Sequence, residues 1–167
     1  MDSSFSALSK AVLKGMYTSH FKDFVRRKLV EQSQVKLGMT GGAEREGIGE
    51  IWCVSNPRLR DHPLVLVSEA FCKMTGYRAE AILGRNCRFL QGPGTSPGSV
   101  QRIRQAIAAG EEHTELLLNY RSSGEPFWNL LAMIPLRARD GSVAYFVGGQ
   151  VGRRRPLLRP LSLVESR

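Results

Sequence analysis

The sequence predicts a small α+β domain in which one five-stranded, mainly antiparallel sheet carries its helices on one face. Two short apolar segments come first, helix-like segments follow, and three long apolar segments separated by turn residues complete the pattern. Short connections between the three long segments require antiparallel pairing. Strands and helices that are grouped separately along the chain are typical of α+β domains.

The amino-acid composition limits the classes of protein to which this chain can belong. The 167 residues are 42% hydrophobic and 23% charged, as in globular proteins. No apolar run approaches the roughly 20 residues that span a bilayer, and residues 1–11 lack the pattern of a secretory signal. The three cysteines and three histidines show no metal-ligand spacing. We therefore expect no metal site and reduced thiols in the cytoplasm, with the nucleus as the alternative.

The net charge of +9 divides the chain into three parts. The end segments, residues 1–49 and 153–167, carry eight and five basic residues against five and one acidic residues, whereas the middle is nearly neutral. This favours an N-terminal extension over residues 1–48, a domain over 49–152 and a basic tail over 153–167. The basic ends are candidates for binding anionic lipid or nucleic acid. Solvated tails that aid solubility are the alternative.

One amphipathic segment lies in the extension. Ser19 is a suitable N-cap and Gly38 a suitable stop for a helix over about residues 19–37. Its large apolar side chains share one face. They are Phe21, Phe24, Val25 and Leu29.

The domain begins with two short strands, over residues 51–55 and 63–67. Ser68 is then a suitable N-cap for a helix that runs to Thr75 and stops at Gly76, and a shorter helix follows over residues 78–83.

The turn-rich residues 92–98 precede a helix over 99–109, which Gly110 closes. Strands over residues 112–121 and 125–136 form a hairpin, and a strand over 142–151 completes the sheet.

Strand side chains alternate between the two faces of a sheet. One face of the three long strands therefore carries amides among apolar side chains, and a hairpin centred on Gly124 sets Asn119 beside Asn129. Buried amides need hydrogen-bond partners, so this face predicts a pocket for a heteroaromatic ligand. Amides at a solvent-facing edge are the alternative. The residues of this face are Leu117, Asn119, Phe127, Asn129, Leu131, Met133, Phe146 and Gln150.

The segment over residues 84–92 places the Cys87 thiol between Asn86 and Arg88, with Gln91 following. Such a mixture suits a polar, anionic ring ligand beside a reactive thiol, although a buried cysteine is more often a small hydrophobe. Arg88 and Arg104 together form a candidate phosphate site, and solvated arginines are the alternative.

The opposite face of the long strands is apolar, and a single domain would not leave it bare. We expect the N-terminal helix, a homodimer or both to cover this outer face. Its residues are Leu116, Leu118, Tyr120, Trp128, Leu130, Ile134, Tyr145, Val147 and Val151.

Several motifs together resemble the LOV (light-oxygen-voltage) photosensory domains of the PAS superfamily, over about residues 49–152. The motifs are Asn86-Cys87-Arg88-Phe89-Leu90-Gln91, Asn56-Pro57-Arg58-Leu59, Phe71-Cys72-Lys73-Met74-Thr75-Gly76-Tyr77, Asn119-Tyr120, Phe127-Trp128-Asn129 and Tyr145-Phe146-Val147-Gly148-Gly149-Gln150. The resemblance implies a PAS fold that binds FMN noncovalently in the dark. Blue light would then produce a flavin triplet, and the sulfur of Cys87 would add reversibly to flavin C4a.

The resemblance also implies roles for the polar residues. Asn119 and Asn129 would bind the pyrimidine edge of the ring, and Gln150 would bond flavin O4 and N5. By similarity, Asn86 and Gln91 bond the ring or ribityl chain, and Arg88 and Arg104 bind the phosphate. Further pocket-lining positions are Cys53, Ser55, Val100, Ile103, Ile107, Leu131, Met133 and Phe146. The family often has Asn at the position of His62, and several members have Val or Thr at that of Cys53.

The function that follows is a blue-light signalling module that is not itself an enzyme. Gln150 has both an amide donor and an acceptor, so it can reverse its hydrogen bonds when flavin N5 becomes protonated. A flavin-based redox sensor or redox enzyme and a chromophore-independent PAS interaction module are the alternatives.

Overall fold

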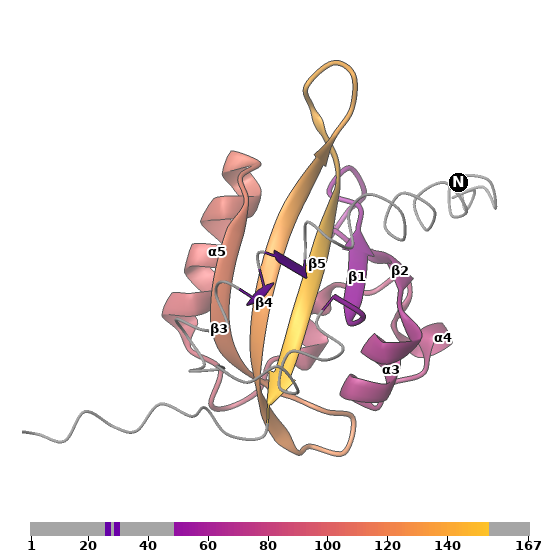
Figure 1. Cartoon of the computed structure of the whole chain (residues 1–167), viewed down its shortest axis with the longest axis vertical. Coiled ribbons are helices and arrows are strands. Elements are labelled where there is room, and N and C mark those ends of the chain that lie inside the picture. The colour runs from indigo at the N-terminus through magenta and orange to yellow at the C-terminus, as the bar shows by residue number, and fades with distance from the viewer. Residues whose placement is uncertain (1–25, 28, 31–48, 154–167) are drawn as a thin grey trace, which may run out of the picture.

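The computed structural model describes residues 26, 27, 29, 30 and 49–153 (Figure 1). A single antiparallel sheet of five strands has the order β2-β1-β5-β4-β3. The predicted α+β arrangement with one five-stranded antiparallel sheet is therefore confirmed. The strands are β1 (Trp52–Ser55), β2 (Leu64–Val67), β3 (His113–Tyr120), β4 (Pro126–Arg137) and β5 (Val143–Arg153).

The helical elements between β2 and β3 follow the predicted order. They are α3 (Glu69–Thr75), α4 (Ala79–Ile82), the 3-10 helix η3 (Cys87–Leu90) and α5 (Pro97–Ala109). Helix α5 lies beside β3, while α3 and α4 lie toward β1 and β2 (Figure 1). Helix η3 lies between these groups and brings Cys87 close to Cys53 on strand β1 of the sheet.

Local chemistry explains most helix ends. The Ser68 hydroxyl accepts a hydrogen bond from the Phe71 backbone N–H at 3.0 Å, and Gly76 ends α3 with a left-handed φ of 76°. Gly110 ends α5 in the same way, with a φ of 68°.

The start of α5 corrects the prediction. The helix begins at Pro97 rather than Ser99, because Ser96 acts as the N-cap and its hydroxyl accepts from the Ser99 N–H at 3.3 Å. Proline is favoured at the first helical position, where its missing N–H would have no partner. Residues 96–98 are therefore the beginning of the helix rather than a plain turn.

The register of the β3–β4 hairpin is a second correction. Asn119 lies opposite Phe127, and Leu117 lies opposite Asn129. The hairpin is thus shifted from the symmetric arrangement about Gly124. The shift leaves the two asparagines on the same face as diagonal neighbours, a position from which their side chains still meet.

Leu29 covers part of the outer face. Leu29 is completely buried against a cluster on this face, which includes Leu130, Ile134 and Val147. The indigo segment that carries it lies over β4 and β5 (Figure 1). The rest of the helix predicted over residues 19–37, with Phe21, Phe24 and Val25, lies outside the described residues, as does the tail beyond Arg153.

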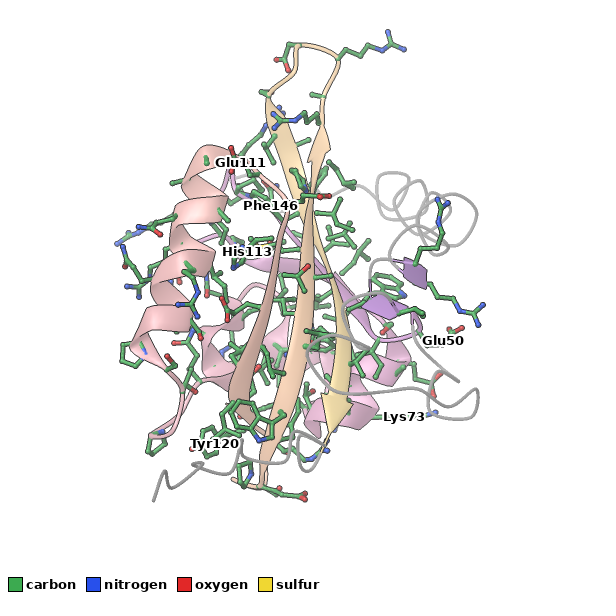
Figure 2. All side chains as sticks on the ribbon, turned by 60° about the vertical axis from the view of Figure 1, so that its left-hand side comes forward. Glu50, Lys73, Glu111, His113, Tyr120 and Phe146 are labelled. Carbon is green, nitrogen blue, oxygen red and sulfur yellow. The ribbon has the colours of Figure 1, made fainter. Side chains whose placement is uncertain are left out.

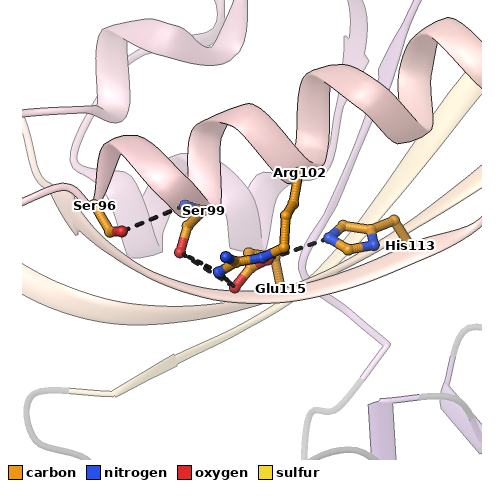
Figure 3. A network of polar contacts seen from close by, with 5 residues as sticks. All are labelled: Ser96, Ser99, Arg102, His113 and Glu115. Atoms are coloured by element: carbon orange, nitrogen blue, oxygen red, sulfur yellow. Dashed lines mark hydrogen bonds and ion pairs between the residues drawn. The ribbon is translucent and has the colours of Figure 1, made fainter.

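A network of polar side chains anchors α5 to β3 (Figure 3). The Glu115 carboxylate accepts hydrogen bonds from Arg102 Nε at 2.8 Å and Nη2 at 3.0 Å, and from the Ser99 hydroxyl at 3.2 Å. His113 Nε2 lies 3.2 Å from the same carboxylate. Burial by itself raises the pKa of Glu115, but the hydrogen bonds from Arg102, His113 and Ser99 outweigh it and lower the pKa to about 2. The network fixes the helix from which pocket residues project.

Candidate functional site

The face of the sheet opposite Leu29 is hollow. A cavity of about 780 Å³, including the open solvent space at its entrance, lies between the sheet, η3 and α5. Its lining residues are Cys53, Ser55, His62, Asn86, Cys87, Arg88, Leu90, Gln91, Ile103, Ile107, Leu117, Asn119, Asn129, Leu131, Met133, Phe146, Gly148 and Gln150. We call this hollow the ring pocket.

A second hollow adjoins the ring pocket at its mouth and shares several of its lining residues, among them Asn86, Arg88 and Phe146. We call this second hollow the mouth. The residues that line the mouth but not the ring pocket include Arg58, Val100 and Arg104. All sixteen residues predicted for the site line one hollow or the other. Fourteen line the ring pocket, and Val100 and Arg104 line only the mouth.

Three buried amides form the floor of the ring pocket. Asn129 Nδ2 donates to Asn119 Oδ1 at 2.9 Å and to Gln150 Oε1 at 3.1 Å. Asn119 is 3% exposed, and Asn129 and Gln150 are each 2% exposed. The alternative of solvent-facing edge amides is therefore wrong for these three residues.

One atom of this floor lacks a partner within the described part of the chain. Asn129 Oδ1 is buried and accepts no hydrogen bond from any residue that the structure describes. An unsatisfied buried acceptor costs about 1–3 kcal/mol. A ligand with an N–H on one edge, lying flat against the apolar walls, would satisfy it. A heteroaromatic ring such as a flavin fits this requirement.

The apolar walls come from both sides of the cavity. Phe146 packs with Ala106, Met133 and Ile103 between α5 and the sheet, as Figure 2 illustrates for Phe146. Leu90 and Cys53 belong to a second apolar cluster, which also includes Phe71 and which Cys87 joins at its edge. The pocket therefore offers flat apolar walls above a polar floor, as a planar heterocycle requires.

The helix η3 holds the thiol at the rim of the pocket. Asn86 caps η3, since its Oδ1 accepts from the Arg88 N–H at 3.0 Å while its Nδ2 donates to the Asp61 carbonyl at 2.7 Å. Asp61 lies in the loop between β1 and β2 with a positive φ of 68°. This bond ties η3 to the loop and fixes the position of Cys87, which is partly exposed.

The thiol of Cys87 has a second thiol beside it. Its Sγ lies 4.0 Å from Sγ of Cys53 in β1, which is 5% exposed. The hydrogen bond with Cys87 raises the pKa of Cys53 well above its usual range, and burial raises it further. Sequence reasoning placed both cysteines at the pocket but did not predict their contact.

The mouth carries the positive charge. Arg88 Nη1 forms an ion pair with Asp61 Oδ2 at 2.6 Å, with both side chains 54% exposed. Arg104 is exposed and lines the same hollow. An exposed ion pair contributes little, so Arg88 can exchange Asp61 for an anionic ligand group at small cost.

Several lining residues were not among the sixteen predicted for the site, although alternation had placed Leu117 on the pocket face. Arg58 lines the mouth and is held by bonds to the Ser142 hydroxyl at 2.6 Å and the Val143 carbonyl at 3.3 Å. Its position directly after Asn56-Pro57, where the chain turns toward the mouth, was the available signal. His62 lines both hollows. Leu90, Leu117 and Gly148 complete the ring pocket.

The described part of the chain lacks two kinds of feature. No helix there is long and apolar enough to cross a membrane. Among residues 49–153 and the four described before them, no group of three His, Cys, Asp or Glu side chains is placed to hold a metal ion.

Comparison with known proteins agrees with this fold. The PAS domain family model matches residues 52–151, so the chain belongs to the PAS domain family. Within that superfamily it is a LOV domain. Among solved structures, the light-state LOV domain of the blue-light photoreceptor Aureochrome1 is 44% identical with a TM-score of 0.60, and covers 61% of this chain and 80% of its own. The LOV domain of an Erythrobacter litoralis blue-light activated histidine kinase is 47% identical with a TM-score of 0.59, and covers 61% of this chain and 94% of its own.

Curated relatives are much longer proteins. A blue-light-activated histidine kinase of Rhizobium johnstonii is 51% identical over 98 residues, which are 59% of this chain and 28% of that protein. Phototropin-2 of Oryza sativa subsp. japonica is 41% identical over 120 residues, which are 72% of this chain and 13% of that protein. The similarity thus covers less than a third of either relative.

Proposed function

We propose that this chain is a blue-light photoreceptor module that binds FMN in the ring pocket and forms a reversible bond to it through Cys87. The observation that carries the proposal is the floor of three buried amides, in which Asn129 Oδ1 has no partner among the described residues, with the Cys87 thiol at the rim of the same pocket. The names of the LOV relatives, which include blue-light receptors, support the same assignment.

The polar floor would bind the edge of the flavin ring. Asn129 Oδ1 would accept from a ring N–H, while Asn119 and Gln150 complete the edge. Asn86 and Gln91 line the pocket nearer the mouth, where the ribityl chain would lie. Arg88 and Arg104 would hold the phosphate by charge-assisted hydrogen bonds. Arg58, at the same mouth, is a third candidate.

When bound, the flavin supplies blue-light absorption and an excited state that accepts a thiol at C4a. Cys87 would provide that thiol, with its sulfur bonding to the carbon and its proton passing to N5. Asn86 positions the cysteine by capping η3. Gln150, 2% exposed, would respond by exchanging its amide donor for its amide acceptor at N5.

The signal would leave through β5 and the outer face. Gln150 and Val151 are neighbours on β5, with Gln150 in the ring pocket and Val151 in the cluster that buries Leu29. We place the light-sensitive element there: the N-terminal helix, a homodimer interface or both. In this proposal the chain is a sensory module rather than an enzyme. Lipid or nucleic-acid binding by the basic ends stays a prediction.

An absorption spectrum tests the proposal. Purified full-length protein should show a flavin spectrum that bleaches in blue light and recovers in the dark. Cys87→Ala should keep the flavin, lose the bleaching and fluoresce persistently. Cys72→Ala is the matched control, because this cysteine on α3 lines neither hollow.

The outcomes separate the candidate functions. Flavin that does not bleach would favour a redox function, and protein without flavin would favour a chromophore-independent interaction module. Normal bleaching in Cys87→Ala would show that the thiol is wrongly assigned.

A further inference from the structure

Cys53 is a thiol for which the proposed light reaction has no use. It lies on β1, 34 residues before Cys87, yet the two sulfur atoms are 4.0 Å apart. Gln150 Nε2 lies 3.5 Å from the Cys53 sulfur on another side. A Cβ added at Gly148 would lie 3.2 Å from the same sulfur, so the glycine leaves room for it. The sulfur is thus enclosed, with Cys87 as its reactive neighbour.

The two thiols differ in access. Cys53 is buried, with 5% of its surface exposed. Cys87 is partly exposed at the rim of the pocket. An oxidant in solution therefore reaches Cys87 first, and Cys53 is placed to react with whatever forms there. This is the arrangement of a peroxide-sensitive thiol beside a resolving thiol.

We propose that Cys53 and Cys87 form a reversible disulfide when the protein meets hydrogen peroxide, and that this bond switches off the light response. The second half of the proposal rests on the proposed function, since it needs Cys87 as the photoactive thiol. The first half, the disulfide itself, does not.

The chemistry balances in two steps. Cys87 attacks one oxygen of hydrogen peroxide, the O–O bond breaks, and Cys87 becomes a sulfenic acid while one water is released. Cys53 then attacks the sulfenic sulfur, its proton joins the departing hydroxide, and a second water leaves. Two thiols are oxidised by two electrons in total, and one peroxide is reduced to two waters.

The geometry allows the second step with little movement. The sulfur atoms must approach from 4.0 Å to bonding distance, a change on the order of 2 Å. A χ1 rotamer change at a cysteine moves its sulfur by roughly that much. Cys53 lies on β1, which is paired on both sides by β2 and β5, so the adjustment falls on Cys87, at the first position of the short helix η3.

The consequence is a receptor that responds to light only while its thiols are reduced. In the disulfide state the amide floor and the apolar walls remain, so flavin binding persists. Cys87, however, has no free sulfur for the light reaction. A reducing thiol restores it by exchange.

The test uses the full chain with flavin bound. The protein is treated with hydrogen peroxide in the dark, and free thiols are alkylated and counted by mass spectrometry. Half of each sample then receives dithiothreitol, and bleaching is recorded. We expect treated protein to lose two hydrogens, to yield a crosslinked Cys53–Cys87 peptide and to lose bleaching, with full recovery after dithiothreitol.

Two variants make the result decisive. Cys53→Val removes the resolving thiol with a side chain suited to the strand, so peroxide should carry Cys87 on to the sulfinic acid, and dithiothreitol should not restore bleaching. Cys72→Ser should behave as the unchanged protein, because Cys72 lies outside the pocket.

Other outcomes overturn the proposal. They are a Cys87 sulfinic acid without crosslink in the unchanged protein, or two alkylatable thiols at positions 53 and 87 after peroxide. If the crosslink forms but the untreated protein never bleaches, the proposed light function fails while the disulfide stands.

Discussion

Asn129 donates a hydrogen bond to Asn119 over 2.9 Å, although the strand register places Leu117, not Asn119, directly opposite it. In this contact the Nδ2 group of Asn129 faces Asn119. The other end of the same amide, Oδ1, is therefore a buried acceptor without a protein partner among the described residues. The Asn129 amide therefore donates to both of its neighbours at this edge of the ring pocket, Asn119 and Gln150.

Asn129→Leu should weaken flavin binding by about tenfold or more. The change removes the acceptor offered to the ring and leaves the side-chain oxygens of Asn119 and Gln150 without their donor. One lost buried hydrogen bond costs about 1–3 kcal/mol, and each 1.4 kcal/mol is tenfold in Kd. Titration of apoprotein with FMN, followed by flavin fluorescence, measures the change. Ser123→Ala, in the exposed hairpin turn, is the control, and an unchanged Kd would contradict the assignment.

Gln150→Leu should keep the light reaction but weaken its output. The thiol of Cys87 is untouched, so bleaching persists, while loss of the amide shifts the flavin absorption band. Leucine has neither a hydrogen-bond donor nor an acceptor, so the protonation of flavin N5 can no longer change a hydrogen bond to β5. Spectra report the first effect, and small-angle scattering in dark and light reports the second. A light-induced change as large as in the unchanged protein would remove Gln150 from the signal path.

Acid should destabilise the domain through Glu115. Its pKa is about 2 in the folded protein and about 4.5 when unfolded, so the carboxylate stabilises the fold at pH values above 4.5. That contribution declines as the pH falls from 4.5 toward 2. Because Arg102 is half exposed, we expect about 1–3 kcal/mol from the network rather than the full value of the shift.

Glu115→Gln tests this expectation by denaturant unfolding across the same pH range. The variant should be less stable at pH 7 and should show a flatter pH dependence between 4.5 and 2. Glu111→Gln, on the exposed side of the α5–β3 connection, should leave the profile unchanged. Parallel profiles for Glu115→Gln and the original protein would rule out this carboxylate as the source of acid sensitivity.

Deleting residues 1–37 should change assembly or solubility without loss of flavin. The deletion removes Leu29, which is completely buried against the outer face. Leu29→Asp is the sharper variant, and Arg27→Ala, an exposed neighbour, is its control. Light scattering coupled to gel filtration, in dark and light, gives the readout. Truncated protein that stays soluble and assembles like the full chain in both conditions would contradict the role proposed for this face.

Much of the site followed from alternation along the strands. Asn129, Leu131 and Met133 share a face because their spacing is two, and the structure places all three at the ring pocket. A register error of an even number of residues leaves every side chain on its predicted face of the sheet, because side chains alternate with a period of two. The hairpin could therefore be displaced about Gly124 without moving Asn119 off the correct face.

Contacts between distant segments could not be predicted in this way. The approach of Cys53 to Cys87 depends on where η3 lies over β1, and no local pattern encodes that position. The start of α5 depended on treating Ser96-Pro97 as a cap and first turn, although the same residues are equally common in loops. The ion pair of Arg88 with Asp61 required the left-handed loop before β2.

The sheet order has a practical consequence for protein engineering. β1 and β5 are adjacent and antiparallel, and the Gln150 backbone N–H donates to the Ile51 carbonyl at 2.8 Å. The chain therefore enters the domain and leaves it within a few residues of one hydrogen bond in the middle of the sheet. Domains with closely spaced ends tolerate insertion into loops of other proteins and circular permutation. Spliced into a host loop at these two points, this domain would place the backbone of its proposed switch residue directly at the junction.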